Sequence, residues 1–214
     1  MRSRGPAGLT LSRLSPAPGR LWPAAILGFL LTISTGAAQD KQKVWDSGPY
    51  SFSDELGGFR ITGVSGKGTR QDPIVIQEEL RSATPITLTI RAIRPVIPFD
   101  PSGDYVSGIL YMRVVTMNNS GHPWQEFQFE LQKILGEPST FSDGLSFDQR
   151  DPEPEHVSSS NFAKFERLLE PYDRLLFSQG KIDPKKSGEF EFLITDYTPR
   201  WAFYIVQDPR IPST

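Results

Sequence analysis

The 214-residue sequence predicts an all-β protein, a β-sandwich of about eight strands with one short helix, preceded by an N-terminal signal peptide. Two observations support this fold class. Hydrophobic residues alternate with polar residues along several short segments, and turns rich in Gly, Asn and Pro separate these segments. The first 38 residues differ in composition from the rest, and we expect them to be removed from the mature protein.

Residues 1–38 have the layout of a signal peptide. The apolar stretch 21–33 follows a segment that carries arginine but no acid, and small residues up to Ala37 and Ala38 offer cleavage sites. The uncharged run 21–39 approaches the roughly 20 residues that span a bilayer, so a retained membrane anchor is one alternative. An organelle-targeting sequence is the other. The basic residues of the segment are Arg2, Arg4, Arg13 and Arg20.

Cysteine is absent from the chain, which excludes disulfide bonds, a thiol nucleophile and a lipid-modified cysteine. Small secreted eukaryotic modules often depend on disulfides, so the composition favours a bacterial periplasmic or secreted protein. The chain has 23 basic and 25 acidic residues, and without the four leader arginines 19 and 25 remain, a net charge of −6. Because the densest basic site is Lys185-Lys186, we do not expect nucleic-acid binding.

The predicted strands follow one another along the mature chain. Alternation is clearest at 86–90, 127–131 and 190–194, where one face of each strand is apolar and the other is polar. Turn sequences at 63–69 and 118–123 predict hairpins or sandwich corners. Further strands are expected at 59–64, 73–77, 108–117, 174–178 and 201–207, and a further turn at 183–188.

The short helix is predicted at 161–170. Phe162 and Phe165 are three residues apart, Leu168 and Leu169 continue that spacing, and Pro171 would end the helix. We expect a single β-sandwich domain over 49–207. A disordered lead-in is expected at 39–48 and a flexible tail at 208–214, because both segments are polar or rich in proline.

One long run resembles a known class of proteins. The sequence RVVTMNNSGHPWQEFQFEL at 113–131, together with 176–184 and 190–192, is similar to the strand-turn-strand pattern of bacterial exported immunoglobulin-like β-sandwiches. The resemblance implies an immunoglobulin-like sandwich and a binding or assembly role. It implies no functional residue, and the chain lacks the cysteine pair of antibody-type domains.

The acidic loop 142–156 contains the candidate metal ligands. Its carboxylates are the oxygen ligands that calcium prefers, and we assign the candidate site to Asp143, Asp148 and Asp151. The spacing does not match an EF-hand, and solvated surface charge explains the same residues. If calcium binds, the loop predicts a calcium-assisted or acid-dependent hydrolase; otherwise no cofactor is expected.

Aromatic residues form the other candidate site. Trp124, Trp201 and Tyr204 are rings of the kind that stack on sugars or anchor protein interfaces, although core packing is the alternative for each. His122 and His156 form no metal-binding or catalytic motif, and no Gly-x-Ser-x-Gly sequence is present. The sequence therefore predicts an exported, non-enzymatic protein that binds a protein or a glycan or assembles in the envelope. It would contact a membrane only if the leader is retained, and the sequence does not predict its oligomeric state.

Overall fold

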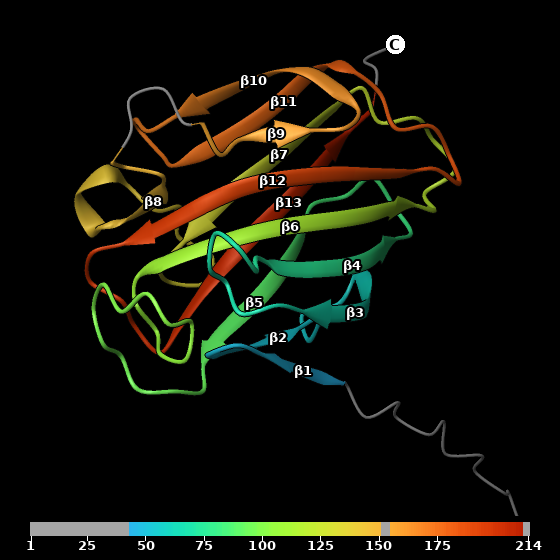
Figure 1. Cartoon of the computed structure of the whole chain (residues 1–214). Helices are drawn as coiled ribbons and strands as arrows, with labels where there is room; N and C mark the ends of the chain where they lie inside the picture. The colour runs from blue at the N-terminus through green and yellow to red at the C-terminus, as the bar shows by residue number, and fades with distance from the viewer. Residues whose placement is uncertain (1–42, 151–154, 212–214) are drawn as a thin grey trace, which may run out of the picture. The chain divides into compact units, whose positions relative to one another are not determined.

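The computed structural model describes residues 43–150 and 155–211, which form strands and a single 3-10 turn but no α-helix (Figure 1). The predicted signal peptide, residues 1–38, lies outside the described residues. The elements are β1 (Val44–Ser47), β2 (Tyr50–Ser53), β3 (Phe59–Ser65), β4 (Ile74–Leu80), β5 (Ile86–Ala92), β6 (Ile109–Asn118), β7 (Glu126–Gln132), η1 (Phe141–Asp143), β8 (Leu145–Phe147), β9 (Ser158–Ser159), β10 (Phe162–Leu168), β11 (Arg174–Gly180), β12 (Ser187–Asp196) and β13 (Ala202–Arg210).

The strands form two sheets, so the all-β, sandwich-like fold is confirmed. One sheet has the order β1-β2-β5-β13-β7-β11-β10, and the other has the order β3-β4-β6-β12-β8, with β9 also paired to β12. All strand pairs are antiparallel except β4 with β6. The strands outnumber the roughly eight predicted, because short strands such as β1, β2, β8 and β9 lack a long alternating pattern.

Aromatic side chains join the two sheets across the core. The ring centroids of Phe127 on β7 and Phe190 on β12 are 4.6 Å apart, and those of Phe129 and Phe192 are 4.8 Å apart. All four side chains are buried, and they occupy alternate positions of their strands. Because such rings bury large apolar areas and pack edge to face or tilted, this cluster is the centre of the hydrophobic core.

The predicted helix at 161–170 is wrong, because Phe162–Leu168 form the edge strand β10, paired with β11. Phe165 lies opposite Phe177, and Phe162 lies opposite Gly180. Between these two partners Gln179 has a φ of 57°, so the backbone departs from regular pairing there and allows both phenylalanines to pack toward the core. The three-residue spacing of Phe162 and Phe165 thus comes from an irregular strand. Pairing with β11 overrides the helical pattern of the local sequence.

Both ends of the folded region extend beyond the predicted limits. Strand β1 lies inside the range expected to be a disordered lead-in, 39–48, and pairs with β2. Strand β13 continues to Arg210, within the range 208–214 expected to be a tail, because its last residues pair with β7. Among the described residues, no helix has the length and hydrophobicity needed to cross a membrane.

Candidate functional site

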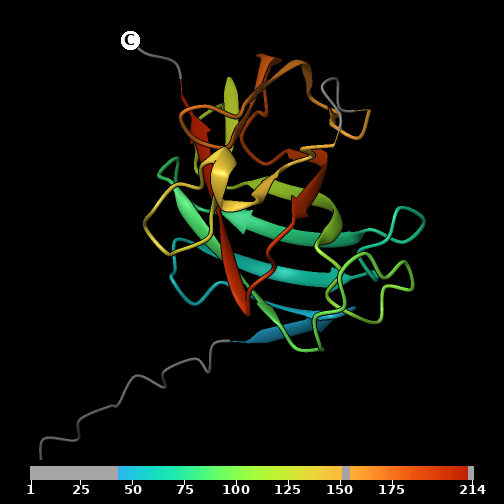
Figure 2. The ribbon, with the colours of Figure 1, turned by 90° about the vertical axis from the view of Figure 1, so that its left-hand side faces the viewer.

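Antiparallel pairing brings three long loops to one end of the two sheets. In the first sheet, the end of β5, the start of β13 and the end of β7 are neighbours, because Arg91 pairs with Ala202 and Gln132 pairs with Tyr204. In the second sheet, the start of β6, the end of β12 and the start of β8 meet in the same way. The loops 93–108, 133–144 and 197–201 therefore share this end, which faces the viewer in Figure 2.

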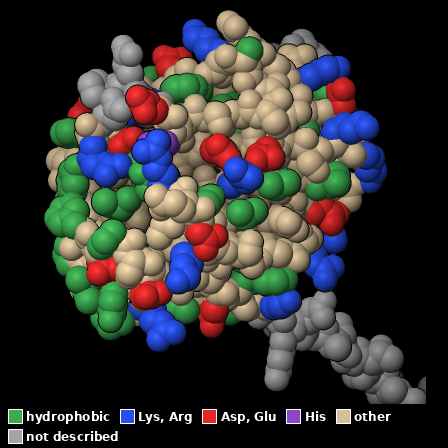
Figure 3. Space-filling model, viewed as in Figure 1, with side chains coloured by type: hydrophobic (Ala, Val, Ile, Leu, Met, Phe, Trp, Pro, Cys, Tyr) green, Lys and Arg blue, Asp and Glu red, His purple; other side chains and the backbone are tan. Residues whose placement is uncertain are grey.

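Most of the large hydrophobic side chains that are exposed in the described residues lie at this end, which we call the apolar end. Trp201 is 69% exposed and Phe99 is 63% exposed, and the Phe99 ring lies 6.4 Å from that of Tyr197, centroid to centroid. Figure 3 shows hydrophobic side chains gathered along the left-hand edge, where these loops lie. Contiguous apolar surface of this kind marks an interaction site in soluble proteins. The residues are Ile93, Ile97, Phe99, Tyr105, Ile134, Leu135, Phe141, Tyr197 and Trp201.

A buried ion pair links two of the three loops of the apolar end, 133–144 and 197–201. The Lys133 ammonium donates hydrogen bonds to the Asp196 carboxylate, at 2.9 Å, and to the backbone carbonyl of Asp143, at 2.7 Å. It also donates to the Thr198 hydroxyl. The Lys133 and Asp196 side chains are almost fully buried, so each charge depends on the other for compensation. This ion pair therefore holds these two loops in fixed positions below the apolar end.

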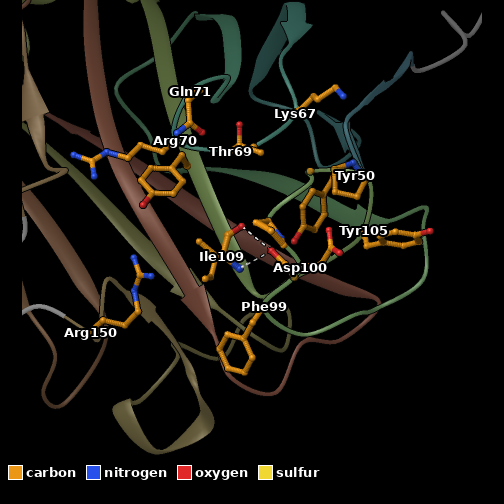
Figure 4. Close-up of a pocket in the computed structure, with 16 residues that line it drawn as sticks. Tyr50, Lys67, Thr69, Arg70, Gln71, Phe99, Asp100, Tyr105, Ile109 and Arg150 are labelled. Carbon is orange, nitrogen blue, oxygen red and sulfur yellow. Dashed lines mark hydrogen bonds between the residues drawn. The ribbon is translucent and has the colours of Figure 1, made fainter.

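A pocket of about 220 Å³ opens beside the apolar end, between the turn 66–72 and the loop 97–107. Figure 4 shows Arg70 and Arg150 on one side of this pocket, with Tyr50 and Tyr105 on the other. The pocket combines cationic side chains with aromatic rings and hydroxyl groups. Such a combination suits a small, charged, partly apolar ligand.

Two buried acids have strongly shifted pKa values. Burial raises the pKa of Glu78 to about 7, although hydrogen bonds from Thr116, at 2.8 Å, and Gln207, at 3.0 Å, oppose the shift. Burial also raises the pKa of Asp173 to about 7, against a hydrogen bond from the Ser146 hydroxyl. Glu78 lies on the inner face of β4, between Ile76 and Leu80.

The structure does not bring the predicted aromatic residues together. Trp124 is 0% exposed, and its indole N–H donates to the Ser120 hydroxyl at 3.0 Å, so it is a core residue and presents no surface to a ligand. Trp124 lies just before β7, next to the end of β13. Trp201 lies just before the start of β13, at the other end of that strand. Tyr204 is half-buried on the outer face of that strand. Of the three, Trp201 lies at the apolar end.

The predicted calcium ligands are already engaged with the protein. Asp143 accepts hydrogen bonds from the backbone N–H groups of Leu145, at 2.9 Å, and Thr140, at 3.2 Å. The Asp148 side chain is buried, with a carboxylate oxygen 3.5 Å from Nε of Arg150. Asp151 lies outside the described residues. Within the described ranges, no three acidic or histidine side chains converge as a metal site.

Sequence reasoning missed most of the apolar end. Phe99, Phe141 and Tyr197 stand in loops, where alternation gives no signal. One usable signal was present: large hydrophobic residues beside proline, as in Ile97-Pro98-Phe99, lie outside the predicted strands and have no strand in which to be buried. In comparisons with known proteins, no family model matches the chain, and no curated protein sequence matches it.

Proposed function

We propose that this chain is an exported, non-enzymatic binding protein whose apolar end docks on the apolar surface of a partner protein. The single observation that supports the proposal is the concentration of exposed hydrophobic side chains at that end. Interface anchors are commonly aromatic, and Trp201, Phe99 and Phe141 are of that kind. The buried Lys133–Asp196 pair reduces the ordering cost of binding because it connects the loops 133–144 and 197–201 in advance.

Two finer proposals accompany it. The two facing, mainly antiparallel sheets support an immunoglobulin-like type of sandwich. The composition of residues 1–38 supports export to the periplasm or the medium, with cleavage after Ala37 or Ala38. Mass spectrometry of the N-terminus from fractionated cells tests export, since a retained leader would contradict it.

Site-specific photo-crosslinking tests the docking proposal. A photoreactive phenylalanine analogue replaces either Phe141, at the apolar end, or Leu56, in the loop between β2 and β3 at the opposite end; both side chains are 48% exposed. In the native organism, we expect a discrete cross-linked protein from position 141 and none from position 56. Adding Trp201→Ser should reduce the cross-link at least severalfold, because it removes a neighbouring anchor.

Equal cross-linking at positions 141 and 56, or no cross-link at position 141, would contradict docking at the apolar end. Insensitivity of the cross-link to Trp201→Ser would do the same. The melting temperature of each variant serves as the control for folding, since neither replaced side chain is buried.

A calcium-assisted or acid-dependent hydrolase built on the loop 142–156 has less support. The hydrogen bonds of Asp143 and the burial of Asp148 beside Arg150 would have to change before these acids could hold calcium. A melting temperature that rises with calcium, and no longer does so in Asp148→Ala, would favour this alternative over the binding protein.

A further inference from the structure

The pocket between the turn 66–72 and the loop 97–107 is preformed by hydrogen bonds within its own walls. The backbone N–H groups of Lys67, Gly68 and Thr69 all donate to the carbonyl of Asp72, at 3.0, 2.9 and 3.2 Å. In the opposite wall, the N–H group of Phe99 donates to the carbonyl of Ser107 at 2.9 Å. These bonds fix the shape of the pocket without a ligand, so binding of a ligand costs little conformational entropy of the pocket walls.

Glycine allows the two walls to approach each other closely. Gly103 has a φ of +75°, and a Cβ atom there would lie 2.8 Å from Cγ2 of Thr69 and 3.0 Å from Cβ of Lys67. A larger residue at this position would push the walls apart. The narrow cavity of about 220 Å³ therefore depends on this contact.

The lining of the pocket has three cationic side chains, Lys67, Arg70 and Arg150, and one acidic side chain, Asp100, although the chain as a whole is acidic. Lys67 forms an exposed ion pair with Asp104 at 3.5 Å, and Arg150 is 3.5 Å from Asp148. Arg70 has no ion pair with any residue that the structure describes. An arginine with a free planar guanidinium group at a pocket rim is suited to bind a carboxylate.

Tyrosine side chains supply the remaining chemistry. The Tyr50 hydroxyl lines the pocket without a hydrogen bond to any described residue, and burial together with the charge of Asp196 raises the pKa of Tyr50, so the hydroxyl keeps its proton. The Tyr105 ring is exposed on the same side (Figure 4). An exposed ring offers a stacking surface, and a hydroxyl offers a hydrogen bond to a ligand oxygen.

We propose that this pocket binds one acidic sugar unit. Its carboxylate would lie on Arg70 and Arg150, on the side of the pocket away from Asp100, and its ring hydroxyl groups would face the Tyr50 hydroxyl and the Asp100 carboxylate, beside Tyr105 (Figure 4). The cavity is smaller than the roughly 300 to 1,000 Å³ of pockets for drug-sized ligands and suits a single hexose-sized group. The site adjoins the apolar end and shares Phe99 and Tyr105 with it, but its proposed ligand contacts Arg70, Arg150 and Tyr50, which are not part of that end, so either proposal can be correct without the other.

Calorimetric titration of the purified protein with three probes tests the proposal. D-glucuronic acid carries the carboxylate, glucose is the neutral match, and glucose 6-phosphate replaces the carboxylate with a phosphate. We expect saturable binding of glucuronic acid and at least tenfold weaker binding of both other sugars. Binding of glucuronic acid should weaken as the salt concentration rises from 50 to 500 mM, because salt screens a partly exposed ion pair.

Variants connect binding to the pocket. Arg70→Ala should weaken glucuronic acid binding at least tenfold, and Tyr50→Phe, which keeps the ring, should weaken it severalfold. Arg81→Ala, an exposed arginine at the opposite end of the sheets, is the matched control and should bind as the wild type does. Equal binding of glucose and glucuronic acid, preference for glucose 6-phosphate, unchanged binding by Arg70→Ala, or no binding of any probe would each overturn the proposal.

Discussion

Glu78 is an acidic side chain placed among apolar residues, and it makes stability depend on pH. It is 2% exposed, and its pKa is raised from 4.5 to about 7 by burial. Between these two values the folded protein keeps a proton that the unfolded chain has lost. The contribution of Glu78 to the free energy of unfolding therefore falls as the pH rises from about 4.5 to about 7, and then stays at the lower level.

Replacing Glu78 by Gln should remove this dependence. The amide keeps an acceptor for Thr116 and needs no ionisation, so we expect Glu78→Gln to raise the free energy of unfolding at pH 8 by up to about 3 kcal/mol, from 1.36 kcal/mol per pKa unit. At pH 4 the variant and the wild type should differ little. Urea denaturation at the two pH values measures the difference.

Glu79, a half-buried residue of the same strand, provides the control. The pKa of Glu79 is lowered, first by a hydrogen bond from Asn119 and also by Arg81, so Glu79→Gln should not stabilise the protein at pH 8. Asp173→Asn should act in the same direction as Glu78→Gln, because burial also raises the pKa of Asp173. A loss of stability at pH 8 in Glu78→Gln would show that the ionised carboxylate is needed.

At the scale of elements, β10 shows how pairing decides between two local patterns. Its residues carry a spacing that favours a helix, but its backbone groups pair with β11, which lies between β10 and β7. An edge strand such as β10 is stabilised by hydrogen bonds to its neighbour and by side chains with high β-propensity. Substitution at an exposed position of β10 therefore distinguishes strand from helix.

Glu166 is exposed on β10 and lies opposite Leu176. Threonine is favoured over glutamate in strands and disfavoured in helices, so Glu166→Thr should raise the free energy of unfolding by up to about 1 kcal/mol. Chemical denaturation monitored by far-ultraviolet circular dichroism is the measurement. Glu137→Thr, in a loop outside any strand, should have no such effect, and a decrease caused by Glu166→Thr would indicate a helix.

At the scale of the whole molecule, the aromatic cluster joins the two sheets, so we expect them to unfold as one cooperative unit. The Phe129 ring contacts rings on both sheets, including those of Phe177 on β11 and Phe192 on β12. Phe129→Ala should lower the free energy of unfolding by about 3 to 5 kcal/mol, because it removes a fully buried ring and leaves a cavity. The loss should appear equally in probes of either sheet.

Phe141→Ala is the matched control for Phe129→Ala, since the Phe141 ring is exposed at the apolar end. Its effect on the free energy of unfolding should stay within about 0.5 kcal/mol. Amide hydrogen exchange followed strand by strand provides the readout for both variants. Loss of protection in the strands of one sheet alone, caused by Phe129→Ala, would show that the sheets unfold independently.

Alternation along the chain was enough to predict the long strands. The patterns at 86–90, 127–131 and 190–194 fall within β5, β7 and β12, because a strand with one buried face requires apolar residues at every second position. The same rule failed for Glu78, which occupies an inward position although it is acidic. Thr116 on β6 and Gln207 on β13 donate hydrogen bonds to the Glu78 carboxyl group and so reduce the cost of burying it. Neither residue is near Glu78 in the sequence.

The sequence by itself determined the all-β class, most of the long strands and some of the turns, because these depend on local periodicity and on backbone preferences of single residues. Only the tertiary structure decided which loops meet at the apolar end, which tryptophan is buried, and that Arg70, Tyr50 and Arg150 line one pocket. These groupings depend on the order of strands within the sheets, which pairs residues far apart in the chain. Trp124 and Trp201 show the consequence: both are aromatic residues beside strand ends, yet strand packing buries one and exposes the other.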